Sequence, residues 1–235
     1  AALGLSDRVR VMLESNRDLL TLRTGRGDYG EKPPSSYHIY FWTIGDSRSP
    51  LDVAAQFEQP ETVETMLGFA SPSDRLVFAC RLGDEERARA LTREHPDLIA
   101  SMTSEQHRAI GDAAWNGDAR AVALMLKLGF DPRAPGYDSG TALHLAAWEG
   151  STEIVSTLLS HPDARALVSV RDARYNATPL GWCCHGSLHG NTSHDHAGVA
   201  RLLLDAGAPI GRDSSEASPS VRSVLNEHRG RSSSD

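Results

Sequence analysis

Two cysteines, four histidines and an aspartate lie within the seventeen residues "LGWCCHGSLHGNTSHDH", residues 180–196. Thiolates and imidazoles are ligands that zinc prefers, so this stretch could form a metal site. A structural zinc site needs two pairs of ligands, however, and the chain holds only one other cysteine. We therefore expect solvated loop histidines and no bound metal or cofactor. The alternative is a metal site formed by His185 and His189 with His194 or His196.

The same stretch fits a repeated helical pattern. Pairs of small residues recur about 33–37 residues apart, a spacing typical of repeat proteins. After each pair comes a segment such as "TEIVSTLLS" or "GVARLLLDAGA", in which apolar residues follow the spacing of one helix face. The cysteines at 183 and 184 are predicted to be the small buried pair between two helices. These pairs are Ala79-Cys80, Ala113-Ala114, Ala146-Ala147 and Cys183-Cys184.

Three short segments carry a family resemblance. "TALHLAA" (141–147), "TPL" (178–180) and "LLLDAGAPI" (202–210) resemble the ankyrin repeat. "DAAWNGD" and "TPLGW" with "HGS" resemble ankyrin-repeat proteins that are common in bacteria. The resemblance implies an all-α fold, an α-solenoid of stacked helix–turn–helix repeats with β-hairpin-like loops between the units. The chain departs from the pattern at Ala142, which replaces the usual proline, and in 73–103, which lacks the turn motif.

The repeat pattern predicts a single ankyrin-type domain over residues 1–230. It contains an inserted loop at 25–48 and ends in a capping helix at 218–228, which a disordered tail at 229–235 follows. The predicted units are 1–24 (partial), 49–71, 72–103, 104–137, 138–174 and 175–211.

Composition excludes several classes of partner. The chain has 235 residues, a net charge of −7 and no run of lysines or arginines, so we expect no nucleic-acid binding. No apolar run approaches the ~18 residues of a membrane span, so we expect no membrane contact. The three cysteines form a poor disulfide framework, which favours a reducing compartment. We expect a cytoplasmic monomer whose partner is another protein.

An ankyrin-like stack presents its first helices along one concave face. The residue after each small pair projects there, which places Trp115, Trp148 and His185 on this face; Asp112 and Trp182 lie one helical turn earlier. Exposed tryptophans usually mark a binding surface. The alternative is that the rings only seal the seam between repeats. The predicted binding residues in the groove and at the hairpin tips are Trp115, Trp148, Trp182, Asp112, Glu149, His185, Tyr137, Arg174 and Tyr175.

These residues predict a non-catalytic scaffold that binds a partner protein. The alternative is an enzyme, or a protein that binds a small molecule or metal, using the Trp/His/Asp cluster of the groove. Asp112 and His185 are a conceivable pair for proton transfer, but no sequence motif of a known catalytic site accompanies them. For His144 the resemblance implies a structural imidazole, bonded to the turn of its own or the next unit; catalysis is the alternative.

Overall fold

A computed structural model describes residues 1–24, 44 and 48–232. Nearly all of the loop predicted at 25–48 lies outside the described residues, as does the end of the predicted tail. Helices form the described part of the chain, and no strand occurs in it, so the all-α prediction is confirmed. The helices are α1 (Ser6–Ser15), η1 (Arg17–Thr21), α3 (Pro50–Gln56), α4 (Pro60–Phe69), α5 (Pro72–Leu82), α6 (Glu85–Glu94), α7 (Leu98–Ser101), α8 (Ser104–His107), α9 (Ala109–Trp115), α10 (Ala119–Leu128), η2 (Tyr137–Ser139), α11 (Ala142–Glu149), α12 (Thr152–Ser160), α13 (Pro162–Arg165), η3 (Ala166–Ser169), α14 (Pro179–His189), α15 (His196–Asp205), η4 (Arg212–Ser214) and α16 (Pro219–Ser232).

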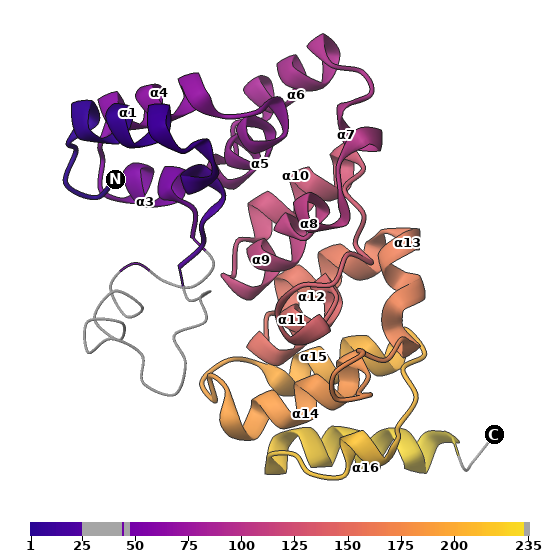
Figure 1. The fold of residues 1–235 in the computed structure, drawn as a ribbon. Helices are drawn as coiled ribbons and strands as arrows, with labels where there is room; N and C mark the ends of the chain where they lie inside the picture. Colours follow the sequence, from indigo (N-terminus) through magenta and orange to yellow (C-terminus); the bar gives the residue numbers. More distant parts are fainter. Residues whose placement is uncertain (25–43, 45–47, 233–235) are drawn as a thin grey trace. The chain divides into compact units, whose positions relative to one another are not determined.

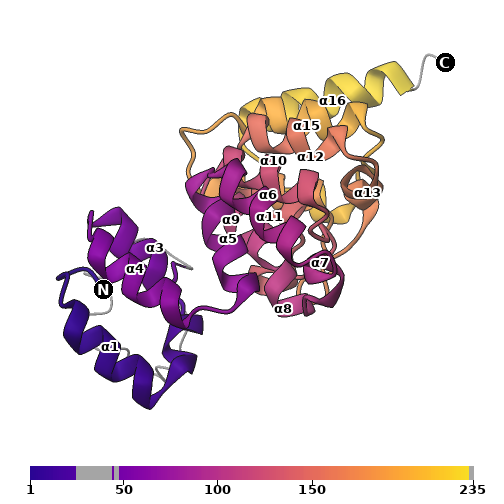
Figure 2. The ribbon, with the colours of Figure 1, turned by 90° about the horizontal axis from the view of Figure 1, so that it is seen from above.

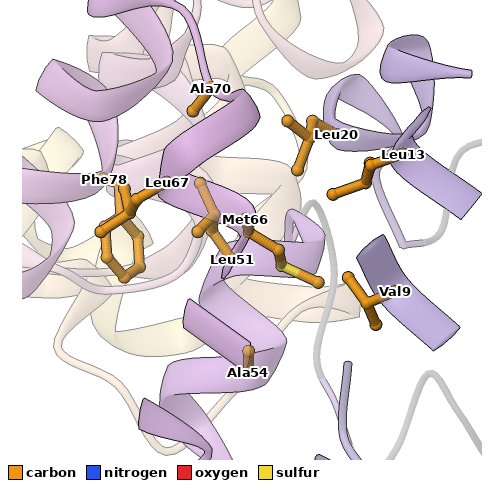
Figure 3. Packing of buried hydrophobic residues seen from close by; sticks show 9 residues of the cluster. All are labelled: Val9, Leu13, Leu20, Leu51, Ala54, Met66, Leu67, Ala70 and Phe78. Carbon is orange, nitrogen blue, oxygen red and sulfur yellow. The ribbon is translucent and has the colours of Figure 1, made fainter. Parts of the chain in front are cut away.

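The chain divides into two compact units, Ala1–Leu98 and Ile99–Asp235. The core of the first unit joins α1, η1, α3, α4 and α5 (Figure 3). Val9 and Leu13 come from α1, and Met66 of α4 and Leu51 of α3 lie among them in this cluster. Burial of these apolar side chains stabilises the unit, because each one removed from water contributes roughly 1.5–3 kcal/mol.

A buried ion pair also belongs to the first unit. Arg81 of α5 donates to Asp52 of α3 at 2.7 Å, and both side chains are almost fully buried. The same carboxylate accepts the backbone N–H of Ser49, while the Ser49 hydroxyl accepts the N–H of Asp52. This capping box begins α3 and satisfies backbone donors that a helix start leaves without partners.

The second unit is a stack of helix pairs (Figure 1). Within each pair α9 packs on α10, α11 on α12, and α14 on α15. The first helices of successive pairs pack together in the order α9, α11, α14, and the second helices in the order α10, α12, α15. The last helix, α16, covers α15 (Figure 2). These pairs fall within 104–137, 138–174 and 175–211, which we predicted to be repeat units.

Small residues let neighbouring helices approach closely. Ala146, Ala147, Cys183 and Cys184 have no exposed surface, which confirms that the cysteines belong to the core. At Gly186 of α14 the approach is tighter still, because a Cβ built there would lie 2.3 Å from the Trp148 carbonyl oxygen of α11. The spacing of α11 and α14 therefore depends on main-chain contact at this point.

The loops between repeats are closed by backbone hydrogen bonds. Gly136 N–H donates to Gly140 O at 2.7 Å, and Asp172 N–H donates to Ala177 O at 2.9 Å. Both loops have the closure of a hairpin without forming strands. At the C-terminal end α16 continues to Ser232, beyond residue 228, after which we predicted a disordered tail.

Candidate functional site

A concave pocket of about 370 Å³ opens on the second unit beside α9, α11 and α14. It is predominantly aromatic, and we call it the aromatic pocket. Six of the nine predicted binding residues line it: Trp115, Trp148, Trp182 and His185 from the helices, and Tyr137 and Tyr175 from the segments between helix pairs. The lining residues are Trp115, Tyr137, Asp138, Trp148, Tyr175, Ala177, Gly181, Trp182, His185 and Asp213.

The rings of this pocket contact one another from different repeats. Trp115 of α9 lies 5.1 Å, between ring centroids, from Tyr137 of the following loop. Trp148 of α11 lies edge-on to Trp182 of α14 at 6.2 Å and beside His185 at 5.4 Å. Trp115 and Trp148 are half-buried, whereas Tyr137 and His185 are exposed. The pocket thus presents aromatic surface to solvent, which a partner can bury.

Trp182 has a different environment, because it is only 6% exposed. Its indole N–H donates to the carboxylate of Asp172 at 2.9 Å. A Cβ built at Gly140 would lie 2.8 Å from the ring, so the indole covers the backbone of the turn before α11. We considered for all three tryptophans that the ring only packs between repeats. This alternative applies to Trp182, which forms the floor of the pocket.

Asp172 organises the loop that carries the pocket rim. Its carboxylate accepts the backbone N–H groups of Arg174 at 2.8 Å, Tyr175 at 2.5 Å and Ala177 at 3.0 Å, besides the indole of Trp182. Burial alone raises the pKa of Asp172, but the hydrogen bonds outweigh it and the pKa is lowered. The carboxylate is thus ionised at neutral pH and holds the loop against α14.

The rim beyond this loop contains a charged cluster. Arg174 donates to Asp138, and the Tyr175 hydroxyl donates to the same carboxylate at 2.7 Å. The Arg174 guanidinium also lies over the Tyr175 ring, 5.3 Å from its centroid. Asp138 has a positive φ of 49°, an uncommon conformation that a turn imposes here. Arg174 contacts the rim in this way and is not among the described residues that line the pocket.

His144 lies beneath the pocket and is fully buried. Its Nδ1 accepts the backbone N–H of Thr141 at 3.2 Å and lies 2.8 Å from the Thr141 hydroxyl. Its Nε2 lies 3.2 Å from Ala177 O, which requires the proton on Nε2. Desolvation by burial lowers the pKa of His144 to about 4, although the hydrogen bond to Ala177 opposes this shift. The neutral ring joins its own turn to the next one, as the resemblance implies.

A second hollow adjoins the first, since Trp115 lines both. We call it the acidic pocket, because Glu149, Glu153 and Asp195 line it. Burial raises the pKa of Glu149, while nearby His194 opposes the shift. Glu149, one of the predicted binding residues, is therefore placed beside the aromatic pocket and not within it.

Asp112 is buried on α9, and its carboxylate lies 3.7 Å from Nε of Arg108. It is not among the described residues lining either pocket. His185 instead lies against Trp148 and His189, and desolvation by burial lowers its pKa. The two members of the conceivable proton-transfer pair therefore have different surroundings.

The prediction of solvated loop histidines is wrong for three of the four, because His185 and His189 lie on α14 and buried His196 begins α15. His185 and His189 lie on α14 with ring centroids 4.4 Å apart. His194 Nδ1 lies 2.5 Å from Glu149 O, and buried His196 Nε2 lies 2.8 Å from Trp148 O. Within residues 1–24, 44 and 48–232, no three His, Cys, Asp or Glu side chains are placed to hold a metal ion together. The contacts of His194 and His196 join the α14–α15 loop to the end of α11.

Comparison with known proteins identifies part of the chain. Residues 110–214 match the family model described as ankyrin repeats, three copies. This segment is therefore similar to ankyrin repeats, and we call it the ankyrin segment. The match covers nearly all of the three helix pairs of the second unit, and all described lining residues of both pockets lie within it.

The chain is also similar to parts of several much longer proteins. A probable E3 ubiquitin-protein ligase, XBOS32, of Oryza sativa subsp. japonica is 31% identical over 60% of this chain and 27% of its own length. The NF-kappa-B inhibitor cactus of Drosophila yakuba is 31% identical over 55% and 24%. A transient receptor potential cation channel, subfamily A member 1, of Drosophila melanogaster is 30% identical over 52% and 9%. The chain thus spans no more than 27% of these relatives.

Several residues that shape the ankyrin segment's pockets were not identified from the sequence. Asp172 lies in a loop and Asp138 and Asp213 lie in the short helices η2 and η4 of the connecting segments, where an isolated aspartate is usually a solvated turn residue. Gly186 follows His185 directly, but nothing in the sequence shows which backbone it meets. Asp172 belongs to the loop sequence "RDARYNA" (171–177), and an aspartate before a tight turn is the signal that could have indicated its role. In the part of the chain that the structure describes, no helix has the length and apolar character needed to cross a membrane.

Proposed function

We propose that this chain is a non-catalytic scaffold that binds another protein through the aromatic pocket and the hairpin tips at its rim. One observation carries the proposal: half-buried Trp115 and Trp148 and exposed Tyr137 and Tyr175, from consecutive repeats, line one concave hollow. Ankyrin repeats typically mediate protein–protein binding, but the fold does not name the partner. The proposal also includes three properties that rest on the sequence alone: a cytoplasmic location, a monomeric state and repeats of the bacterial type.

Trp148 is the residue whose loss tests the proposal most directly. It lies against two other rings of the pocket and is not fully buried. Truncation to alanine removes a large contact area, and hot-spot tryptophans contribute ~2 kcal/mol or more to affinity. Phe57 is the matched control, since it is an aromatic residue of the first unit that is 40% exposed.

The experiment compares wild type, Trp148→Ala and Phe57→Ala chains as baits in quantitative pull-downs, followed by affinity measurement for each captured protein. We expect Trp148→Ala to lower the affinity for a specific partner about thirtyfold and Phe57→Ala to leave that affinity unchanged. Circular dichroism of each bait checks that it is folded. Partners that bind the Trp148→Ala chain as tightly as the wild type contradict the proposal.

The second candidate is binding of a small molecule, because about 370 Å³ lies within the ~300–1,000 Å³ typical of ligand pockets. Native mass spectrometry of gently purified chain distinguishes the two. A small molecule retained by the wild type and lost from Trp148→Ala favours this candidate over a protein partner.

A further inference from the structure

The two adjoining pockets have a common charge. Asp138 and Asp213 line the aromatic pocket, and Glu149, Glu153 and Asp195 line the acidic pocket. Among the described residues that line either one, there is no lysine or arginine. The side chains of two histidines, His185 and His194, are the basic groups that face these hollows. The combined surface is therefore aromatic and acidic.

The carboxylates are not equivalent. In the aromatic pocket Asp138 is already paired with Arg174, and Asp213 lies 3.4 Å from Arg171, so little net negative charge remains there. In the acidic pocket Glu149 is the last residue of α11, at the end where the helix dipole is negative. Burial raises its pKa, and nearby His194 opposes the shift. The excess charge therefore lies beside Trp115, on the acidic side.

Arg174 shows how a cation is held at the rim of these pockets. Its guanidinium packs over the Tyr175 ring and pairs with Asp138 at the same time. Aromatic faces attract cations through the ring quadrupole, and a nearby carboxylate adds direct charge pairing. Trp115 and Glu149 line the same acidic pocket, so an aromatic ring and a carboxylate both border it. In that pocket no described lysine or arginine takes the position that Arg174 has at the rim.

We propose that the partner presents a basic segment, with one arginine or lysine side chain packed against Trp115 and paired with Glu149 and Glu153. This inference rests on the proposed function and deepens it, because it names the chemistry of the bound segment. Neighbouring side chains of the segment occupy the aromatic pocket on the other side of Trp115. The net charge of −7 favours approach of such a partner over an acidic one.

Two matched peptides test the inference on the full chain. The first is a fluorescein-labelled peptide of alternating alanine and arginine, and the second has citrulline in place of each arginine, which keeps the shape and removes the charge. We expect fluorescence anisotropy to show at least about tenfold tighter binding of the arginine peptide. We also expect this binding to weaken as salt is raised from about 0.05 M to about 0.5 M. Equal affinity for the two peptides, or no binding of either, overturns the inference.

Charge variants then locate the site. Glu149→Gln with Glu153→Gln removes two carboxylates, and we expect at least about fivefold weaker binding of the arginine peptide. The fold is expected to tolerate Glu149→Gln, because burial already penalises the charged form. Glu94→Gln is the control, since Glu94 is an exposed glutamate of α6 in the other compact unit. If Glu94→Gln weakens peptide binding as much as the double variant, or if the double variant binds the peptide as tightly as the wild type, the assignment to the acidic pocket is overturned.

The outcomes separate this inference from the proposed function. If Trp148→Ala abolishes binding of a captured protein and the two glutamate changes leave its affinity unaltered, the proposed function is supported and the inference is overturned. If peptide binding depends on Glu149 and Glu153 but a captured protein binds the Trp148→Ala chain as tightly as the wild type, the inference is supported and the proposed function is overturned.

Discussion

His144 makes the stability of the ankyrin segment depend on pH. Its ring is fully buried and bonded through Nδ1 to Thr141 and through Nε2 to Ala177, in the neutral form. The folded-state pKa is about 4, against an ordinary value of 6.5 in an unfolded chain. The unfolded chain therefore takes up a proton first as the pH falls, and protonation favours unfolding.

The sign and size of the effect follow from these two pKa values. The contribution of His144 is fully present above about pH 6.5 and is lost progressively as the pH falls towards 4. Over the whole interval the loss is about 3 kcal/mol, and at about pH 5 it is about 2 kcal/mol. Such a loss is a large fraction of the stability of an ordinary domain.

The variant His144→Gln separates this effect from every other titration. A glutamine at the equivalent position already caps another helix of this chain, where Gln106 Oε1 accepts the N–H of Thr103 at 2.8 Å. His144→Gln therefore keeps the cap and removes the titrating ring. Glu149, whose raised pKa acts in the opposite direction, is present in both proteins.

Urea unfolding, followed by circular dichroism at about pH 7.5 and about pH 5, gives the free energy of unfolding of both proteins. We expect wild type to lose about 2 kcal/mol more than His144→Gln between the two conditions. An equal loss in both proteins would refute the assignment of a neutral, desolvated ring.

Two further changes probe the framework of the pockets. Gly186→Ala places a methyl group against the Trp148 carbonyl, and we expect about 1–3 kcal/mol of destabilisation with a shift in Trp fluorescence; unchanged values would show that α14 moves freely. Asp172→Ala removes a buried acceptor of four N–H groups, and we expect about 3 kcal/mol of destabilisation by urea unfolding together with increased exposure of Trp182 to acrylamide quenching. Unaltered quenching would contradict the role of Asp172 as the anchor of that ring.

The sequence predicts the helical repeat well, because helix pairs follow from local patterns. The small pairs at 146–147 and 183–184 fix which helix faces pack together. That register also indicates the side on which Trp115, Trp148 and His185 project. Amphipathic spacing and caps are local properties, so a single sequence is enough to predict them.

The detailed site depends on contacts between residues far apart in the chain. Trp182 was predicted to face the groove one helical turn before the position that Trp115 and Trp148 share, but its ring is buried because it meets Gly140 and Asp172. Glu149 and Asp112 were both predicted to face the groove, and the structure places one in the adjoining hollow and the other beneath the surface. Side-chain direction in tertiary packing is not encoded in spacing alone.

The approach of α14 to α11 at Gly186 has a consequence for how such a surface diversifies. The separation of these two helices, which both supply lining residues to the hollow, depends there on main-chain contact, because Gly186 has no side chain. Substitutions at outer positions such as Tyr175 can alter which chemical groups are recognised and leave the separation of the two helices unchanged. Ligand preference and pocket dimensions are in this way separable properties, encoded at different residues.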